Sequence, residues 1–326
     1  MFRVFCHSPE HAMQIIINKK TGKELHRKMT RGFVTIATGD EKYFRLAANL
    51  LHSYRFFSSD PMPFALICDK ENKYSKEFDQ IIILNAPFCS YNDKLYLPDL
   101  IPYDETIFLD ADSLAYRDLN DFWGAFENGS DFSAFGKDYP TDFPYAWFKL
   151  EDICEFSETI ESIPDFVGGV YYLRKGPRLS SFSETCQYVF KNYYRFKFRQ
   201  FPDPEDEAIF ALAMSIHGFT TAGDRSLPVC FYPHPTIFKA DLISGNIYYN
   251  NRYHPEDGMS YNAYMIHWST RNTIKPVYLL EVYKLNCLLK GKQPGKAAVF
   301  LAGIWFWVIF QAGRVKRKLR RILRLP

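Results

Sequence analysis

Short apolar runs alternate with an amphipathic segment in the first third of the chain. Four of these runs are almost entirely apolar, namely Phe33–Ala37, Phe64–Cys68, Ile81–Leu84 and Thr106–Leu109. Lys42–Phe57 predicts a helix, because Leu46, Leu50 and Tyr54 recur at helical spacing. Apolar strands that alternate with helices predict an α/β fold with a Rossmann-like, mostly parallel central sheet and helices on both faces.

The remaining segments form a more mixed pattern. Further strands are predicted at Asp131–Phe135, Gly169–Leu173, Val229–Tyr232 and Tyr264–His267. Helices are predicted at Ser180–Tyr194 and Asp206–Ile216, and proline marks loops at Pro202–Pro204 and Pro228–Pro235. Within residues 1–30, Ala12–Asn18 predicts a strand and Lys19–Gly22 a turn.

The C-terminal tail is apolar and then basic. Ala297–Gly313 has seventeen residues without a charge, and Arg314–Arg324 carries seven cations. A membrane span needs about 20 apolar residues, whereas Trp305, Trp307 and the basic helix favour a peripheral position on anionic lipid. We therefore expect residues 31–285 to form the main domain and 286–326 a peripheral membrane anchor. A spanning helix, or a helix packed on the domain or a dimer interface, is the alternative.

Charge and cysteine usage narrow the functional classes. The formal net charge is +3, but Glu281 is the last acidic residue and eleven Lys and Arg follow it. The preceding part is therefore net acidic, which argues against nucleic acid as a partner. The seven cysteines contain no CxxC pair, and no apolar run of signal-peptide type occurs in the first 30 residues. We expect a cytoplasmic protein at the inner face of the membrane.

Two aspartates follow the predicted strand Thr106–Leu109. Asp110 and Asp112 are separated only by Ala111, and ligands of open α/β sheets bind at the carboxyl ends of strands. Carboxylate oxygens suit Mg²⁺ or Mn²⁺, and such a cation could bridge a diphosphate and neutralise its growing charge. The alternative is that these aspartates only cap a following helix.

The segment FLDADSLAYRDL resembles the DxD segment of GT-A fold glycosyltransferases, especially the family of glycogenin and bacterial galactosyltransferases (glycosyltransferase family 8). The resemblance implies transfer of a sugar from a nucleotide sugar, such as a UDP-sugar, to a glycan or lipid-linked acceptor. It also implies a Mn²⁺ or Mg²⁺ cofactor, retention of anomeric configuration, and contact of Ala111 with the donor.

Two earlier segments carry the resemblance to the nucleotide site. VTIATGDEKYF resembles the opening strand and loop of that family, which implies that Ala37, Thr38 and Tyr43 contact the base and ribose. SYNDKLYLPDLIPYDETIFLDAD places Lys94 where the family has a basic residue that touches the donor.

Three later segments resemble the sugar and metal sites. FVGGVYYLRKG matches an FNSGV-type strand, with Val167 and Gly168 in place of Asn and Ser; Gly168 and Gly169 would admit the donor closely, and Asp165 could bind a sugar hydroxyl. PEDEAIFALAM resembles a DQ-containing helix start, which places Asp206 and Glu207 near the transferred sugar. YMIHWSTRNTIKPVY resembles an HxxGxxKPW-type segment, two residues longer and without its Gly, which implies His267 as a third metal ligand and Lys275 on the diphosphate.

Simpler roles remain open for several of these residues, since acids favour helix N-termini in any protein and His267 could be a core histidine. We expect the acceptor between two aromatic-rich loops, residues 138–165 and 232–262, with Tyr139, Tyr145, Trp147, Tyr248 and Tyr249. Two rival functions also remain. IFLDADSL is similar to the DxDxT motif of HAD phosphotransferases, in which Asp110 would be the nucleophile, and an inactive, membrane-associated sugar-nucleotide-binding module is the other.

Overall fold

The computed structural model describes the chain except residues 1–15, 18–28, 128, 143–146, 154–155, 157–159, 199–201, 224–228, 233–237, 251–258, 262 and 323–326. The predicted turn at Lys19–Gly22, most of the predicted strand at Ala12–Asn18, and Tyr145 lie outside the described residues. The chain divides into two compact units, which are described separately. The first unit comprises Met1–Ala48, Met62–Ala111 and Ala125–Gly223, and the second comprises Asn49–Pro61, Asp112–Gly124 and Asp224–Pro326.

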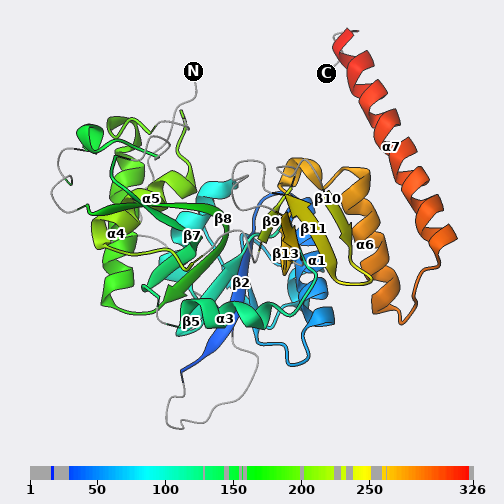
Figure 1. The fold of residues 1–326 in the computed structure, drawn as a ribbon, viewed down its shortest axis with the longest axis horizontal. Coiled ribbons are helices and arrows are strands. Elements are labelled where there is room, and N and C mark those ends of the chain that lie inside the picture. Colours follow the sequence, from blue (N-terminus) through cyan, green and yellow to red (C-terminus); the bar gives the residue numbers. More distant parts are fainter. Residues whose placement is uncertain are drawn as a thin grey trace. The chain divides into compact units, whose positions relative to one another are not determined.

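A seven-stranded sheet forms the centre of the first unit (Figure 1), in the order β1-β4-β3-β2-β5-β8-β7. Four adjacent strands are parallel, namely β4 (Gln80–Ile83), β3 (Phe64–Cys68), β2 (Arg31–Ala37) and β5 (Glu105–Leu109). Every residue of β3 and β5 is buried, so both faces of these strands are covered, as their apolar sequences predict. The predicted α/β class is confirmed.

Antiparallel strands complete this sheet. β1 (Ile16–Ile17) pairs with β4, and β8 (Ser162–Arg174) lies between β5 and β7 (Phe132–Pro140). β7 and β8 are longer than the sequence pattern predicts, and their register shifts between Ala134 and Gly136. A shift of this kind bends a strand.

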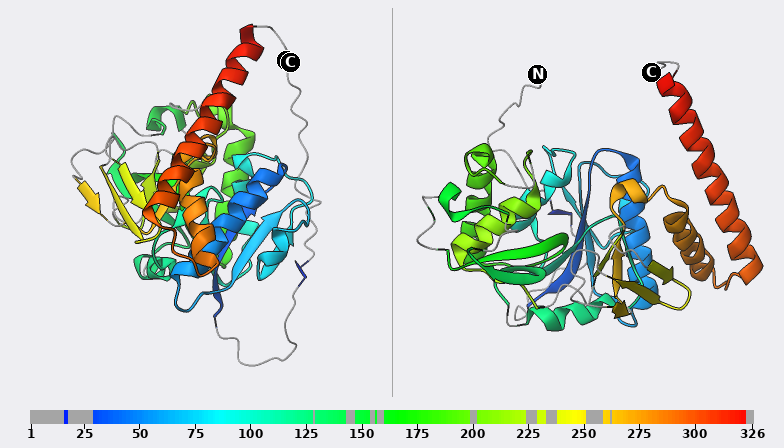
Figure 2. Two further views of the ribbon diagram at one scale, coloured as in Figure 1. Left: turned by 90° about the vertical axis from the view of Figure 1, so that its right-hand side faces the viewer. Right: turned by 45° about the horizontal axis from the view of Figure 1, so that its top comes forward.

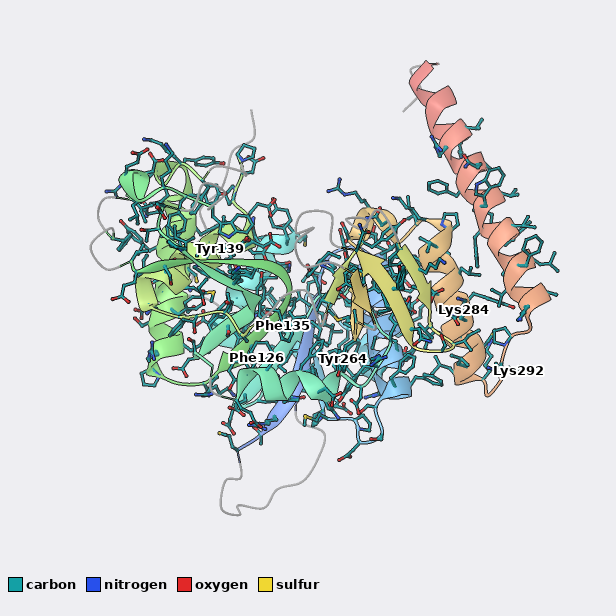
Figure 3. The ribbon with its side chains drawn as sticks, in the orientation of Figure 1. Phe126, Phe135, Tyr139, Tyr264, Lys284 and Lys292 are labelled. Carbon is teal, nitrogen blue, oxygen red and sulfur yellow. The ribbon has the colours of Figure 1, made fainter. Side chains whose placement is uncertain are left out.

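Helices and aromatic side chains form the core of the first unit beside β8 and β7. The helices are α2 (Leu97–Leu100), α4 (Pro177–Lys191) and α5 (Asp206–His217). Phe132 stacks on Phe182 with ring centroids 4.4 Å apart. The ring centroids of Phe126 and Phe135, which Figure 3 labels, are 4.9 Å apart. Many of the aromatic residues that could suggest sugar binding are therefore buried in the core, where their role is packing.

The second unit contains two small sheets. In one, β13 (Met265–His267) lies between β6 (Ser113–Ala115) and β9 (Val229–Phe231). The other is antiparallel and contains β10 (Phe238–Asp241), β11 (Asn246–Asn250) and β12 (Met259–Tyr261). The expected loop at 232–262 therefore includes three strands. The helices α1 (Glu41–Phe57) and α3 (Phe122–Phe126) contribute residues to both units.

Two helices end the chain. α6 (Pro276–Leu289) is followed by the long helix α7 (Lys296–Ile322), whose course is clear in both views of Figure 2. The predicted apolar and basic tail is thus one continuous helix. By length and composition alone, its segment Lys296–Lys316 could cross a membrane, and none of that segment is buried against the protein.

Candidate active site

Asp110 lies directly after β5, at the carboxyl end of the central sheet. Its backbone N–H donates to the Gly169 carbonyl on the neighbouring strand, at 3.0 Å, which fixes where the chain leaves the sheet. Its carboxylate Oδ2 lies 2.9 Å from the Lys94 ammonium. The sheet therefore places this carboxylate at the edge where α/β proteins bind ligands.

Lys94 is buried and contacts three acceptors. Its Nζ lies 2.9 Å from Asp110 and 3.2 Å from Asp206, and it donates to the Gly168 carbonyl at 3.0 Å. Burial alone would lower the pKa of Lys94, but the charges of Asp110 and Asp206 outweigh it and hold the pKa above its usual value. An ammonium has three N–H groups to donate, and all three are used here. The phosphate of a nucleotide sugar could therefore bind Lys94 only by displacing one of these partners.

Gly168 and the start of α5 are joined by hydrogen bonds. The Gly168 N–H donates to Glu207 Oε1 at 2.6 Å, and the Tyr171 hydroxyl donates to Asp206 Oδ2 at 2.9 Å. A Cβ at Gly168 would lie 2.4 Å from the Tyr171 hydroxyl and 2.9 Å from Glu207. Only glycine fits here without a shift, so Gly168 lets the Glu207 carboxylate approach the backbone.

The residues predicted to contact the nucleotide lie at the end of β2 and in the segment that follows it. The Thr38 hydroxyl donates to the buried carboxylate of Asp93 at 2.5 Å, and the Phe88 N–H donates to the same carboxylate at 2.6 Å. Burial raises the pKa of Asp93, although these hydrogen bonds oppose the shift. Ala37 is buried, whereas Tyr43 is partly exposed on α1. Asp93 thus holds the loop that carries Thr38, a role that the sequence pattern did not predict.

In the second unit, the Asp112 carboxylate lies beside the side chains of His267 and Thr270. His267 Nε2 lies 2.9 Å from Asp112 Oδ1, and the Thr270 hydroxyl donates to Oδ2 at 2.8 Å. The Trp268 N–H donates to the Asp112 carbonyl at 3.0 Å, and the register of β6 and β13 places His267 opposite Ser113. Pairing of these strands therefore brings the predicted third ligand to Asp112.

Lys275 lies at the start of α6 in the second unit. Its ammonium lies 5.3 Å from the centre of the Tyr232 ring, and its backbone N–H donates to the Asn272 carbonyl at 2.9 Å. The short turn Thr270–Asn272 connects this lysine to the segment that contacts Asp112. Lys275 and His267 therefore lie at the two ends of one short connection between β13 and α6.

Two aromatic residues expected near the acceptor are core residues. Trp147 is 8% exposed and its indole N–H donates to the Pro164 carbonyl at 3.1 Å. Tyr249 is 4% exposed and its hydroxyl donates to the Val229 carbonyl. Tyr139 and Tyr248 are partly exposed in their separate units, and Asp165 lies opposite Lys137 in the register of β8 and β7.

Glu205 and Tyr91 are functional candidates that the sequence did not single out. Burial, then the Asp206 charge, raises the pKa of Glu205 to about 6. Burial, then the Glu205 charge, raises the pKa of Tyr91 to about 12. The sequence contained a signal for the shift at Glu205, namely the acidic run that ends in Glu205, Asp206 and Glu207. Neighbouring carboxylates repel one another and so raise one another's pKa.

No protein-family model and no curated protein matches the sequence. Among solved structures, the chain is similar to the bifunctional glycosyltransferase WbbM in its apo form, with 14% identity and a TM-score of 0.46 over 86% of this chain and 53% of that one. The chain thus spans about half the length of WbbM.

Two further solved structures are similar. Mouse xyloside xylosyltransferase 1 in its apo form has 13% identity and a TM-score of 0.45, over 74% of this chain and 99% of that one. The galactosyltransferase LgtC, in complex with donor and acceptor sugar analogues, has 12% identity and a TM-score of 0.42, over 62% of this chain and 76% of that one. All three of these solved structures are glycosyltransferases.

Proposed function

We propose that this protein is a metal-dependent glycosyltransferase that uses a nucleotide sugar, with UDP-sugars as the first candidates. The observation that carries the proposal is the arrangement of side chains around the Asp112 carboxylate. His267 and Thr270 hold its carboxylate, and Asp110 is two residues away in the chain. Because consecutive residues span at most about 3.6 Å each, the Cα atoms of Asp110 and Asp112 lie within about 7 Å of each other in any arrangement of the chain.

The residues present fit a divalent cation. Asp110, Asp112 and His267 each offer one ligand atom. Carboxylate oxygens suit Mg²⁺ and Mn²⁺, and an imidazole nitrogen shifts the preference of the set toward the transition metal Mn²⁺. A cation bound there would neutralise the charge of the departing diphosphate. Thr270 would keep its hydrogen bond to Asp112 and so orient that ligand.

The neighbouring residues of the first unit have positioning roles in this proposal. Lys94 fixes Asp110, Asp206 and the Gly168 peptide through its three contacts. Asp206 and Glu207 would stabilise positive charge on the transferred sugar, and a negative environment of this kind suits an oxocarbenium-like state. Asp165 and Gly169 would line the same sugar, and retention of configuration follows from the family resemblance.

The nucleotide would lie against the ends of β2 and β5. Thr38, ordered by Asp93, and the partly exposed Tyr43 would contact the ribose and base. Ala37 and Ala111 would pack against the donor, and Lys275 would contact its diphosphate as a point charge. The acceptor would be a glycan or a lipid-linked glycan.

A screen of nucleotide sugars for Mn²⁺-dependent hydrolysis tests the proposal. We expect release of the nucleoside diphosphate from one sugar donor, and loss of roughly 100-fold or more of this activity in Asp110→Asn and in Asp112→Asn, the range typical of lost electrostatic stabilisation. Asp60→Asn, at an exposed site, is the matched control and should keep full activity.

Full Mn²⁺-dependent hydrolysis by Asp112→Asn would contradict the metal assignment. Turnover of a phosphomonoester with no turnover of any nucleotide sugar would instead support the phosphotransferase reading of Asp110. Binding of a nucleotide sugar without hydrolysis in the presence of Mn²⁺ would support the inactive binding module.

We also propose that the tail holds residues 31–285 at the cytoplasmic, inner face of an anionic membrane. Its support is the exposed apolar surface of α7, including Trp305 and Trp307, followed by the basic stretch that begins at Arg314. Deletion of 297–326 should lower transfer to a membrane-embedded acceptor and leave transfer to a soluble acceptor unchanged. Equal loss, or no loss, on both acceptors would contradict this location.

A further inference from the structure

Helices α6 and α7 meet along a seam in the second unit. Tyr283 and Phe306 make an edge contact, with ring centroids 6.4 Å apart. One turn earlier on both helices, a Cβ at Gly303 would lie 3.9 Å from Leu280. Leu280 and Tyr283 lie one turn apart on α6, and Gly303 and Phe306 lie one turn apart on α7, so the two helices meet over at least one turn of each.

A groove of about 620 Å³ runs beside this seam. Its apolar lining comes from three elements, with Ile243 from the turn after β10, Leu280 from α6, and Val299, Phe300, Ile304 and Trp307 from α7. The volume lies within the range of about 300–1,000 Å³ that is usual for sites that enclose a small molecule. The groove is therefore large enough for a single apolar chain.

The polar side chains in the wall of the groove are satisfied by one another. The Lys284 ammonium, labelled on α6 in Figure 3, donates to Asp241 at 2.8 Å and to Glu281 at 2.7 Å. Glu281 also accepts from the Tyr116 hydroxyl at 3.0 Å and the Leu242 N–H at 2.7 Å. This wall presents paired charges and gives a polar ligand little to bind.

Basic residues occur in the lining of the groove and in the turn between α6 and α7. The lining includes Pro294 from that turn and Lys296, the first residue of α7. Lys290 and Lys292 are exposed in the same turn, where Figure 3 labels Lys292, and no acidic residue follows Glu281. One lysine in the lining and two exposed lysines in the adjoining turn match an amphipathic molecule with an anionic head.

The opposite side of α7 is also apolar. Leu301 is 64% exposed, Trp305 63% and Val308 45%. A helix that is apolar all round requires an apolar environment, so the groove opens toward that environment rather than toward bulk water. This favours a membrane lipid over a water-soluble ligand.

We propose that the groove between α6 and α7 binds one acyl chain of an anionic glycerophospholipid, with its headgroup against Lys290, Lys292 and Lys296. The site would anchor the second unit to one lipid molecule, in addition to the general affinity of α7 for a bilayer. It is independent of sugar transfer and requires no metal ion.

Photocrosslinking of the full chain tests this site. The protein is placed in nanodiscs of equal parts phosphatidylcholine and phosphatidylglycerol, with a trace of phosphatidylglycerol whose acyl chain carries a diazirine. We expect adducts on Leu280, Phe300 and Ile304. Ile243→Trp and Val299→Trp fill the groove from opposite walls and should each abolish the adduct on Leu280, whereas Leu301→Trp on the outer side of α7 should leave it unchanged.

The lysines are tested in the same assay. Replacing Lys290, Lys292 and Lys296 with Gln should reduce the preference for phosphatidylglycerol over phosphatidylcholine, by roughly fivefold for each charge removed. Adducts confined to Leu301, Trp305 and Val308, or an adduct on Leu280 that persists in both groove-filling variants, would overturn the groove. An unchanged lipid preference would overturn the headgroup position. No Mn²⁺ or nucleotide sugar is present, so the result is separate from that of the proposed enzyme activity.

Discussion

Two buried lysines, one in each unit, have nearly the same surroundings. Lys94 contacts Asp110 and Asp206, and Lys284 contacts Asp241 and Glu281. For both, burial alone would lower the pKa and the neighbouring carboxylates raise it above the usual value. A buried lysine between two acids therefore does not identify a functional site, because structural ion-pair networks shift pKa values in the same way.

The difference between the two networks lies in their carboxylates. Glu281 accepts hydrogen bonds from Tyr116 and Leu242 as well as Lys284, so α6 is fastened to the segments around it. Asp110 is instead partly exposed, at 22% of its side chain, ends a central strand, and precedes Asp112 by two residues. We infer that Lys284 holds the fold, whereas Lys94 prepares a carboxylate for a ligand.

Replacing each lysine with Met gives the largest expected effects. Either change leaves two carboxylates close together without their cation, which costs about 3–5 kcal/mol for a buried pair. Thermal unfolding should show similar destabilisation of Lys94→Met and Lys284→Met. Addition of Mn²⁺ with UDP should then raise the melting temperature of Lys94→Met more than that of the unchanged protein, because the cation replaces the lost positive charge beside Asp110.

Lys284→Met is the control for this rescue. Its melting temperature should rise with Mn²⁺ and UDP only as much as that of the unchanged protein. Equal rescue of both variants would show that the two networks do not differ in function.

Replacing one glycine in each unit with alanine should have a smaller effect on stability, and only one of the two changes should affect activity. A Cβ at Gly168 would lie 2.4 Å from the Tyr171 hydroxyl, and a Cβ at Gly245, which has a φ of +68°, would lie 2.6 Å from the Tyr116 carbonyl. Each Gly→Ala change should lower the free energy of unfolding by about 1–3 kcal/mol. Only Gly168→Ala should also reduce donor hydrolysis, because Gly168 touches Lys94 and Glu207. Normal hydrolysis per folded molecule in Gly168→Ala would show that the Gly168 peptide has no role in donor hydrolysis.

Much of the fold could be predicted from the sequence, because its strands are locally apolar and its helices locally periodic. Phe64–Cys68 was predicted with the bounds that the structure gives it. The short strands β6 and β10–β12 were missed, since their stability comes from pairing with distant segments, such as Ser113 with His267. The antiparallel β8 and β7 were predicted too short for the same reason.

The site residues divide in a similar way. The position of Asp110 and Asp112 after a buried strand could be predicted from the apolar run before them. The resemblance proposed His267 as a third ligand beside them, and its ring lies 2.9 Å from Asp112. The partners of Lys94, and the bond from Thr38 to Asp93, join residues far apart in sequence. No local pattern contains such contacts, so their geometry required the folded structure.

The smallest expected effect is a pH dependence at Glu205. The pKa of Glu205 is raised to about 6 from an ordinary value of 4.5, chiefly by burial and then by the charge of Asp206. The folded state therefore binds a proton more tightly than the unfolded chain, and the stability that this provides is present below pH 4.5 and lost as the pH rises through 6.

Glu205→Gln removes this ionisation. Relative to the unchanged protein, the variant should gain stability between pH 4.5 and 7.5, by at most about 1 kcal/mol because the group is only partly buried. Thermal unfolding at both pH values measures the change, and Glu184→Gln at an exposed position should show a constant difference. A constant difference in Glu205→Gln as well would mean that the pKa of Glu205 is not raised in the folded protein.

The most direct test of the account is the position of Mn²⁺ in crystals grown with Mn²⁺ and UDP, measured by anomalous scattering at the manganese edge. We predict one strong peak with a carboxylate oxygen of Asp110, a carboxylate oxygen of Asp112 and a ring nitrogen of His267 at coordination distances of about 2.0–2.3 Å. A map in which UDP is bound but no peak lies beside these three side chains would contradict the central claim.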